Sequence, residues 1–194
     1  MNRTIKFISI QLCALIVFSG CSEPAALGHI NTNDSYQGIR EQIIQDFFRD
    51  PAAAGENYRS VFSLPSTPER KYLAAKIVVC GQLKAKELEV ESSCQARINE
   101  GLKESNEEIR SLAISALAYS IDDSAQSILI AALADRSTIV KIEAAQALNY
   151  QLVTLSSDPN NPEASKQLRS KLLEFCQSKR TDATSASDEL CEKI

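Results

Sequence analysis

The sequence of 194 residues contains no tryptophan and only six glycines, and no segment shows the alternation of Val, Ile, Thr and aromatic residues that is typical of β-strands. Hydrophobic residues make up 44% of the chain, with many Ala and Leu, which favour helix over sheet. A chain of this length can bury one substantial core. We therefore predict an all-α protein with a single folded domain.

Motifs of the common catalytic sites are also missing. The chain has no Gly-x-Ser-x-Gly, no His-Glu-x-x-His and no phosphate-binding glycine loop. Its one histidine, His29, has no carboxylate cluster or second histidine near it, so we interpret it as a solvated linker residue. The cysteines beyond residue 21 are too widely spaced for the ligand pairs of a zinc site. We predict no metal, no cofactor and no catalytic activity.

Long hydrophobic runs are absent as well. The longest, residues 7–18, has 12 residues, whereas a transmembrane helix needs about 20. Two basic residues, Arg3 and Lys6, precede this run, and small residues follow it, which is typical of a secretion signal. We therefore assign residues 1–20 to a signal peptide.

The junction Phe18-Ser19-Gly20-Cys21 resembles a bacterial lipobox, with Phe18 in place of the usual Leu. The resemblance implies that Cys21 is the lipidation site and becomes an acylated N-terminus, held firmly in a bilayer by its acyl chains. Ser22 after the cysteine implies an outer-membrane location facing the periplasm. An ordinary cleaved signal with an incidental cysteine is the alternative.

Residues 21–35 would then comprise the lipidated cysteine and a flexible tether, because residues 22–35 are rich in Pro, Gly, Asn and Ser and have no helical stripe. The folded domain is expected to span residues 36–194.

One pattern occurs twice between residues 106 and 152. Its apolar members fall at i, i+4, i+7 and i+8, which is one stripe of an α-helix. A helix pair recurring at such a period is typical of an α-solenoid, because one pair cannot bury its own apolar face. Seven residues of the first copy, Ile109, Arg110, Ala113, Ala116, Leu117, Tyr119 and Ile121, are matched 31 residues later by Val140, Lys141, Ala144, Ala147, Leu148, Tyr150 and Leu152.

Residues 133–148, read as L-x-D-x-x-x-x-V-K-x-E-A-A-x-A-L, and residues 102–117 resemble short HEAT repeats, including those of phycobilisome-lyase-type proteins. The resemblance covers roughly a third of the chain and implies a short α-solenoid of antiparallel helix pairs. It also implies that Glu104 and Asp135 cap helices and pair with basic residues along the stack. The expected units are an N-terminal cap pair (residues 36–66), three repeats (67–104, 105–135 and 136–180) and a C-terminal cap (181–194).

Within these units, the pattern of apolar and turn residues predicts most helix limits. A first helix is expected to end near Asp50, and a short second helix is expected around Tyr58, Val61 and Phe62. Further helices are expected to start at Thr67-Pro68-Glu69 and to span residues 93–103, 162–179 and 187–193.

Four cysteines remain beyond residue 21, and in an oxidising periplasm they most simply form two disulfides, with three possible pairings. In the repeat alignment, Cys80 ends a first helix and Cys94 begins the second helix of the same pair. These ends meet in an antiparallel hairpin. We therefore predict disulfides between Cys80 and Cys94 and between Cys176 and Cys191.

Charge argues against a nucleic-acid partner. Residues 1–20 hold two basic residues and no acidic one, so the rest of the chain has 19 basic and 25 acidic residues and a net charge of −6.

The resemblance to HEAT repeats implies a partner-binding surface on the second helix of each pair. The candidates on the outward side of those helices are Ser127, Ile130, Ala131 and Ala134, then Asn99, Glu100 and Lys103 by the shift of 31 residues, and Arg169 in the third repeat. Ser115 is expected on the opposite, convex face. Alternatively, a neighbouring helix covers Ile130.

Two classes of function remain. The first is a non-catalytic protein-binding module, an adaptor, assembly accessory or inhibitor, whose partner is an unknown envelope or secreted protein. The second, which rests only on the resemblance to lyase-type repeats, is an enzyme or enzyme chaperone.

Overall fold

The computed structural model describes residues 30, 34–64, 70–159, 162–178 and 191–192, and all regular structure in these ranges is helical. The prediction of an all-α protein is confirmed. No helix in the described ranges is long and apolar enough to cross a bilayer. The elements are α2 (Tyr36–Arg49), α3 (Pro51–Arg59), a 3₁₀ turn η2 (Ser60–Ser63), α4 (Arg70–Ala85), α5 (Cys94–Leu102), α6 (Glu107–Leu117), α7 (Asp123–Ala132), α8 (Thr138–Ser157) and α9 (Pro162–Ser178).

Short polar side chains fix where several helices begin. The Ser35 hydroxyl accepts the Gly38 N–H at the start of α2, and Asn106 accepts two backbone N–H groups at the start of α6. Asp50 caps α3 and is followed by Pro51 at the first helical position, so α3 begins earlier than the sequence pattern predicted. The expected start at residues 67–69 and most of the expected helix 187–193 lie outside the described residues.

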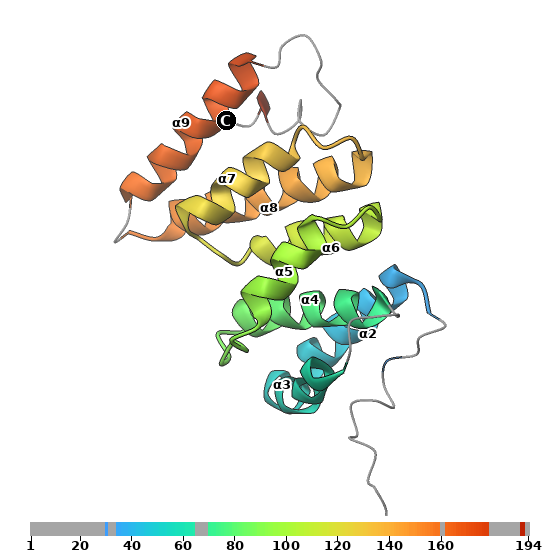
Figure 1. Ribbon diagram of the computed structural model, residues 1–194. Coiled ribbons are helices and arrows are strands. Elements are labelled where there is room, and N and C mark those ends of the chain that lie inside the picture. Colours follow the sequence, from blue (N-terminus) through green and yellow to red (C-terminus); the bar gives the residue numbers. More distant parts are fainter. Residues whose placement is uncertain (1–29, 31–33, 65–69, 160–161, 179–190, 193–194) are drawn as a thin grey trace, which may run out of the picture.

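Most of the helices fall into two sets (Figure 1). Helices α2, α4, α6 and α8 form the first set, and α5, α7 and α9 form the second. In the first set, α4 packs against α2 and α6, and α6 packs against α8. In the second set, α5 contacts α4 and α6, α7 contacts α8 and α6, and α9 contacts α8 and α7, whereas α5 and α7 do not touch. Each second-set helix therefore packs on the first-set helices beside it.

Small residues allow α4 and α6 to approach closely. A Cβ atom built on Gly81 would lie 3.1 Å from the Cα atom of Ala116, which is tighter than ordinary contact. Apolar side chains from both helices are fully buried at this junction and extend the core toward α8. The core of these three helices includes Leu73, Ile77, Leu83, Ile109, Ala113, Leu117, Val140, Ala144 and Leu148.

A buried glutamine joins α8 to the end of α6. Gln151 is fully buried, and its side-chain amide donates to the carbonyl oxygens of Leu117 at 3.1 Å and Ser120 at 3.0 Å. The Leu117 carbonyl also accepts the Ser120 N–H at the end of α6, so Gln151 adds a side-chain donor from α8 to this turn. Beside this contact, Tyr119 and Tyr150, matched in the sequence pattern, pack edge to face with ring centroids 5.2 Å apart.

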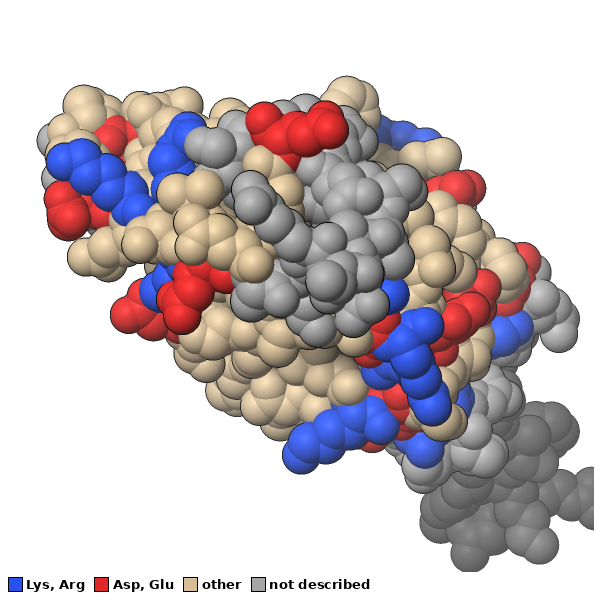
Figure 2. All heavy atoms as spheres, turned by 90° about the horizontal axis from the view of Figure 1, so that it is seen from above, with Lys and Arg blue, Asp and Glu red and all other residues tan. Residues whose placement is uncertain are grey.

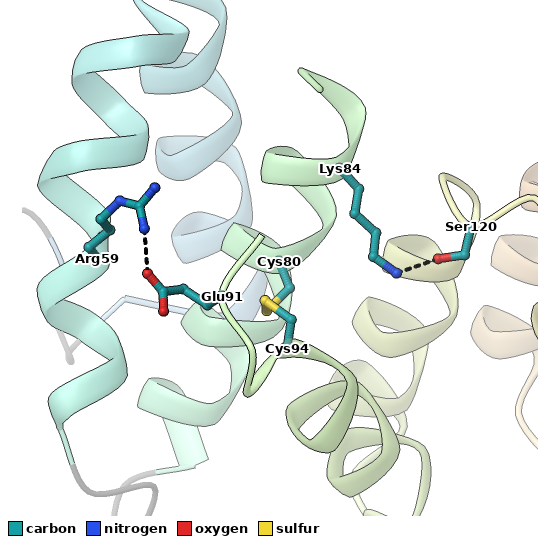
Figure 3. Close-up of a disulfide and its surroundings, with 6 residues drawn as sticks. All are labelled: Arg59, Cys80, Lys84, Glu91, Cys94 and Ser120. Carbon is teal, nitrogen blue, oxygen red and sulfur yellow. Dashed lines mark hydrogen bonds and ion pairs between the residues drawn. A yellow bond between two sulfur atoms is a disulfide. The ribbon is translucent and has the colours of Figure 1, made fainter. Parts of the chain in front are cut away.

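Both predicted disulfides are present. Cys80 and Cys94 have Cα atoms 5.5 Å apart, and Cys176 and Cys191 have Cα atoms 5.8 Å apart. The first bond closes the loop between α4 and α5, and Figure 3 shows the loop residue Glu91 held from the other side by Arg59 of α3, with 2.7 Å between Nη1 and Oε1. The loop is therefore fixed at both edges.

Two details differ from the sequence-based expectation. Ile30 lies in the segment predicted to be a flexible tether, yet it belongs to the hydrophobic core with 8% of its surface exposed. Ser115, expected on an open convex face, is half-buried and accepts a hydrogen bond from Arg40 of α2 at 3.2 Å. The repeat pattern could not show either feature, because both come from the N-terminal segment, which departs from that pattern.

Candidate protein-binding groove

The four residues predicted on the outward side of α7 line one open groove. Its other wall comes from α9, and its volume is about 510 Å³. The residues that line it are Ser127, Ile130, Ala131 and Ala134 from α7 and its C-terminal end, with Lys171, Glu174 and Phe175 from α9.

The periodicity of α7 produces this wall. Ala125, Leu129 and Leu133 are buried against the neighbouring helices, so residues on the opposite side of α7 are left outward. Ser127, Ala131 and Ala134 are exposed, and Ile130 is half-buried. Because the outward residues next to Ile130 are small, a partner can approach the helix backbone closely.

The α9 wall is held at a fixed distance from α7 by Lys171. Its Nζ atom lies 2.8 Å from Oδ1 of Asp123 and 3.2 Å from Oε1 of Gln126, both on α7. Gln126 is buried, Asp123 is exposed and Lys171 is half-buried, so the lysine bridges the surface and the buried side of α7. Its charge is therefore already satisfied within the protein.

Glu174 is the charged residue of the groove that is left for a partner. Its carboxylate is exposed and makes no ion pair or hydrogen bond among the described residues. Phe175, the next residue, is half-buried and packs on the hydrophobic core. The groove thus combines apolar contacts from Ile130 and Phe175 with one negative charge at its rim.

The other predicted surface residues are not part of this groove. On α5, Asn99 bonds to Gln95 and Glu100 pairs with Arg97 at 2.8 Å, and Lys103 is exposed. The groove therefore includes the residues predicted on α7 but not those predicted on α5.

Arg169 is exposed but does not line the groove either. It precedes Lys171 by two residues, which places it roughly 200° away around α9. Arg169 was predicted by carrying the repeat register across the inserted loop, and the groove between α7 and α9 does not include it. The buried residues Leu168 and Leu172 mark the side of α9 that faces the core.

Lys76 and Tyr58, two titratable side chains outside the groove, have shifted pKa values. Burial of Lys76 lowers its pKa, and the charge of nearby Arg97 acts in the same direction. The charge of Glu100 acts to raise the pKa, but the net shift is downward. The Lys76 ammonium donates a hydrogen bond to the Leu64 carbonyl. Burial raises the pKa of Tyr58, and so does its hydrogen bond to Asp46. Within the described ranges, no group of three or more His, Cys, Asp or Glu side chains is placed to hold a metal ion.

Acidic and basic side chains are interspersed on the face of the molecule seen in Figure 2, with no large area of one sign. A long-range electrostatic attraction to a strongly charged polymer is therefore not supported by this face. Comparison with known proteins finds no protein-family model that matches the chain and no curated protein with significant similarity to it.

Proposed function

We propose that this chain is a non-catalytic protein-binding module that takes an apolar segment of another protein into the groove between α7 and α9. The observation that carries the proposal is the groove itself, with apolar side chains from Ile130 and Phe175 and the unpaired carboxylate of Glu174 at its rim. Such a site fits a short segment that presents one or two apolar anchors next to a basic residue.

The proposed architecture is a short α-solenoid of HEAT-like pairs. Two ion pairs at corresponding places support it. Arg70 in the first turn of α4 pairs with Glu104, which follows α5, at 3.0 Å, and Arg110 of α6 pairs with Asp135, which follows α7, also at 3.0 Å. In each case, a basic residue of one helix holds the chain that follows the second helix of the same pair.

Photo-crosslinking is expected to locate the bound partner. A photo-reactive amino acid at the exposed position of Ala131 is expected to give a discrete covalent adduct with one partner protein in cells that make the full chain. Ala134→Arg in the same chain is expected to reduce the adduct at least tenfold, because the long side chain fills the groove. The adduct is measured by immunoblotting and its partner peptide by mass spectrometry.

Arg169 provides the matched control, since it is exposed on the same helix as one groove wall but faces away from it. The same photo-reactive residue at position 169 is expected to give no such adduct. If position 169 captures the same protein equally well, or if Ala134→Arg leaves the adduct from position 131 unchanged, the groove is not the binding site.

We also propose that Cys21 carries a lipid anchor that holds the module at the periplasmic face of the outer membrane. The support is the signal-like sequence of residues 1–20 and the lipobox-like junction, and Cys21 lies outside the described residues. Cys21→Ala is expected to abolish lipid labelling and to leave the protein unprocessed. Incorporation of a labelled fatty acid and fractionation of the envelope measure this, and unchanged processing and membrane retention would rule out the anchor.

A further inference from the structure

Helix α8 carries a second apolar surface, on the side that faces away from the core. Four large hydrophobic side chains are exposed there: Ile139 by 45%, Ile142 by 39%, Tyr150 by 45% and Val153 by 59%. Together with the exposed Gln146, they are spaced by three, four, four and three residues, so they lie along one side of the helix. We call these five residues the α8 stripe. The opposite side of α8 is buried, which makes the stripe separate from the α7 and α9 groove.

The spacing of the α8 stripe is the same in both directions, with a large apolar residue at each position around Gln146. Ile142 and Tyr150 are each four residues from Gln146, and Ile139 and Val153 are each seven residues from it. If a second copy of α8 packed antiparallel with Gln146 facing its counterpart, Ile142 would meet Tyr150 and Ile139 would meet Val153. Both contacts would occur twice. This is the self-complementarity that a two-fold symmetric interface requires.

The charges beside the stripe permit such a pairing. Glu143, at its edge, is already neutralised within its own chain by Arg40, with 2.7 Å between Nη1 and Oε1. In the antiparallel arrangement, Glu143 lies six residues, or about 9 Å, along the helix axis from its counterpart, and each is paired with the Arg40 of its own chain. No like charges therefore meet, and Gln146 can hydrogen-bond to its own counterpart on the axis.

We propose that the α8 stripe is a self-association surface on which a second copy of this chain packs antiparallel, with the two-fold axis at Gln146. A single helix side provides a few hundred Å² per copy, less than the roughly 800 Å² per partner of a stable soluble dimer. The dimer is therefore weak and depends on a high local concentration. Because the stripe and the groove are separate, self-association does not depend on the proposed groove function.

Engineered cysteines in the full chain test this register. Gln146→Cys places two cysteines on the axis, so mild oxidation is expected to yield a covalent dimer, detected on non-reducing gels with two differently tagged copies. Val153→Cys alone is expected not to link, since 14 residues at 1.5 Å each separate position 153 from its counterpart by about 21 Å. A mixture of Ile139→Cys and Val153→Cys chains is expected to link.

Gln167→Cys on α9 is the matched control for random collision, because it is exposed and lies outside the stripe. The yield from Gln146→Cys is expected to exceed the control at least tenfold and to fall to the control level when Ile142→Asp is added. Ile142 is half-exposed, so its change leaves the fold intact, which a retained Cys80–Cys94 bond confirms. Linking at position 146 no greater than at 167, or equal linking by Val153→Cys alone, would overturn the proposal.

Discussion

Replacing Cys80 and Cys94 together by alanine is expected to lower the free energy of unfolding by about 3 kcal/mol. The bond closes a segment with a sequence separation of 14 residues, and in the chain-entropy model a loop of this size contributes about that much. Both cysteines are fully buried, so nothing in the folded state replaces the lost link. The loop between α4 and α5 would keep only non-covalent contacts, among them the ion pair with Arg59 and the packing of Leu88 on the core.

Urea denaturation followed by circular dichroism measures this effect. The matched control replaces Cys176 and Cys191, which close a loop of similar length but are half-exposed near the C-terminal end. The control variant is expected to lose less stability, because its bond holds a peripheral segment. Equal losses in the two variants, or an unchanged midpoint for the buried pair, would contradict this account of the core.

Arg110→Ala is expected to cost about 2–4 kcal/mol, the range for removing one partner of a largely buried ion pair. The Arg110 side chain is only 9% exposed and binds both carboxylate oxygens of Asp135, at 3.0 and 3.3 Å. It also donates to the carbonyl oxygens of Glu104 and Ser105, at 2.9 and 2.8 Å. The alanine variant removes these four hydrogen bonds and leaves Asp135 with the Ser137 N–H as its remaining hydrogen-bond donor.

The same ion pair predicts how stability depends on pH. Partial burial of Asp135 acts to raise its pKa, but hydrogen bonds from Arg110 and the Ser137 N–H and the charges of Arg110 and Arg136 outweigh it, so the net shift is downward from 3.8. A carboxylate with a lowered folded pKa stabilises the fold above its unfolded pKa, and this contribution is lost as the pH falls through the folded value. In chemical denaturation from pH 7 to pH 3, Arg110→Ala is therefore expected to lose less stability than the parent chain.

Lys141→Ala, an exchange of a half-exposed base in the first turn of α8, is the control for Arg110→Ala. It is expected to cost under 1 kcal/mol and to keep the pH slope of the parent chain. If Arg110→Ala also costs under 1 kcal/mol, the link between α6 and the chain after α7 does not stabilise the fold as inferred.

The sequence predicted the helices and both disulfides because these depend on local information. Apolar spacing defines the buried side of each helix, although the start of α3 at Pro51, capped by Asp50, was not predicted. The pairing of Cys80 with Cys94 followed from placing each at the end of a helix in one hairpin. Such features need only neighbours close in the chain.

The rest of the fold and the groove depended on contacts between distant segments. The repeat pattern identified the α7 wall of the groove but not Lys171, Glu174 and Phe175, since an insertion before α9 breaks the register. It also could not show that α2 covers Ser115, because α2 has no counterpart in the repeats. The exposure of the α8 stripe likewise depends on which side of α8 the other helices cover.

The ion pair between Arg40 and Glu143 has a consequence for how the chain folds. It joins α2 to α8 across 103 residues, whereas the other helix contacts mostly join near neighbours. A stack held together only by adjacent pairs can nucleate anywhere and lose its end units one at a time. Here α2 completes its contacts only when α8 has folded. Because α2 packs on α4, α4 on α6 and α6 on α8, most of this loop is closed before the pair forms, and the pair then couples the unfolding of α2 to that of α8.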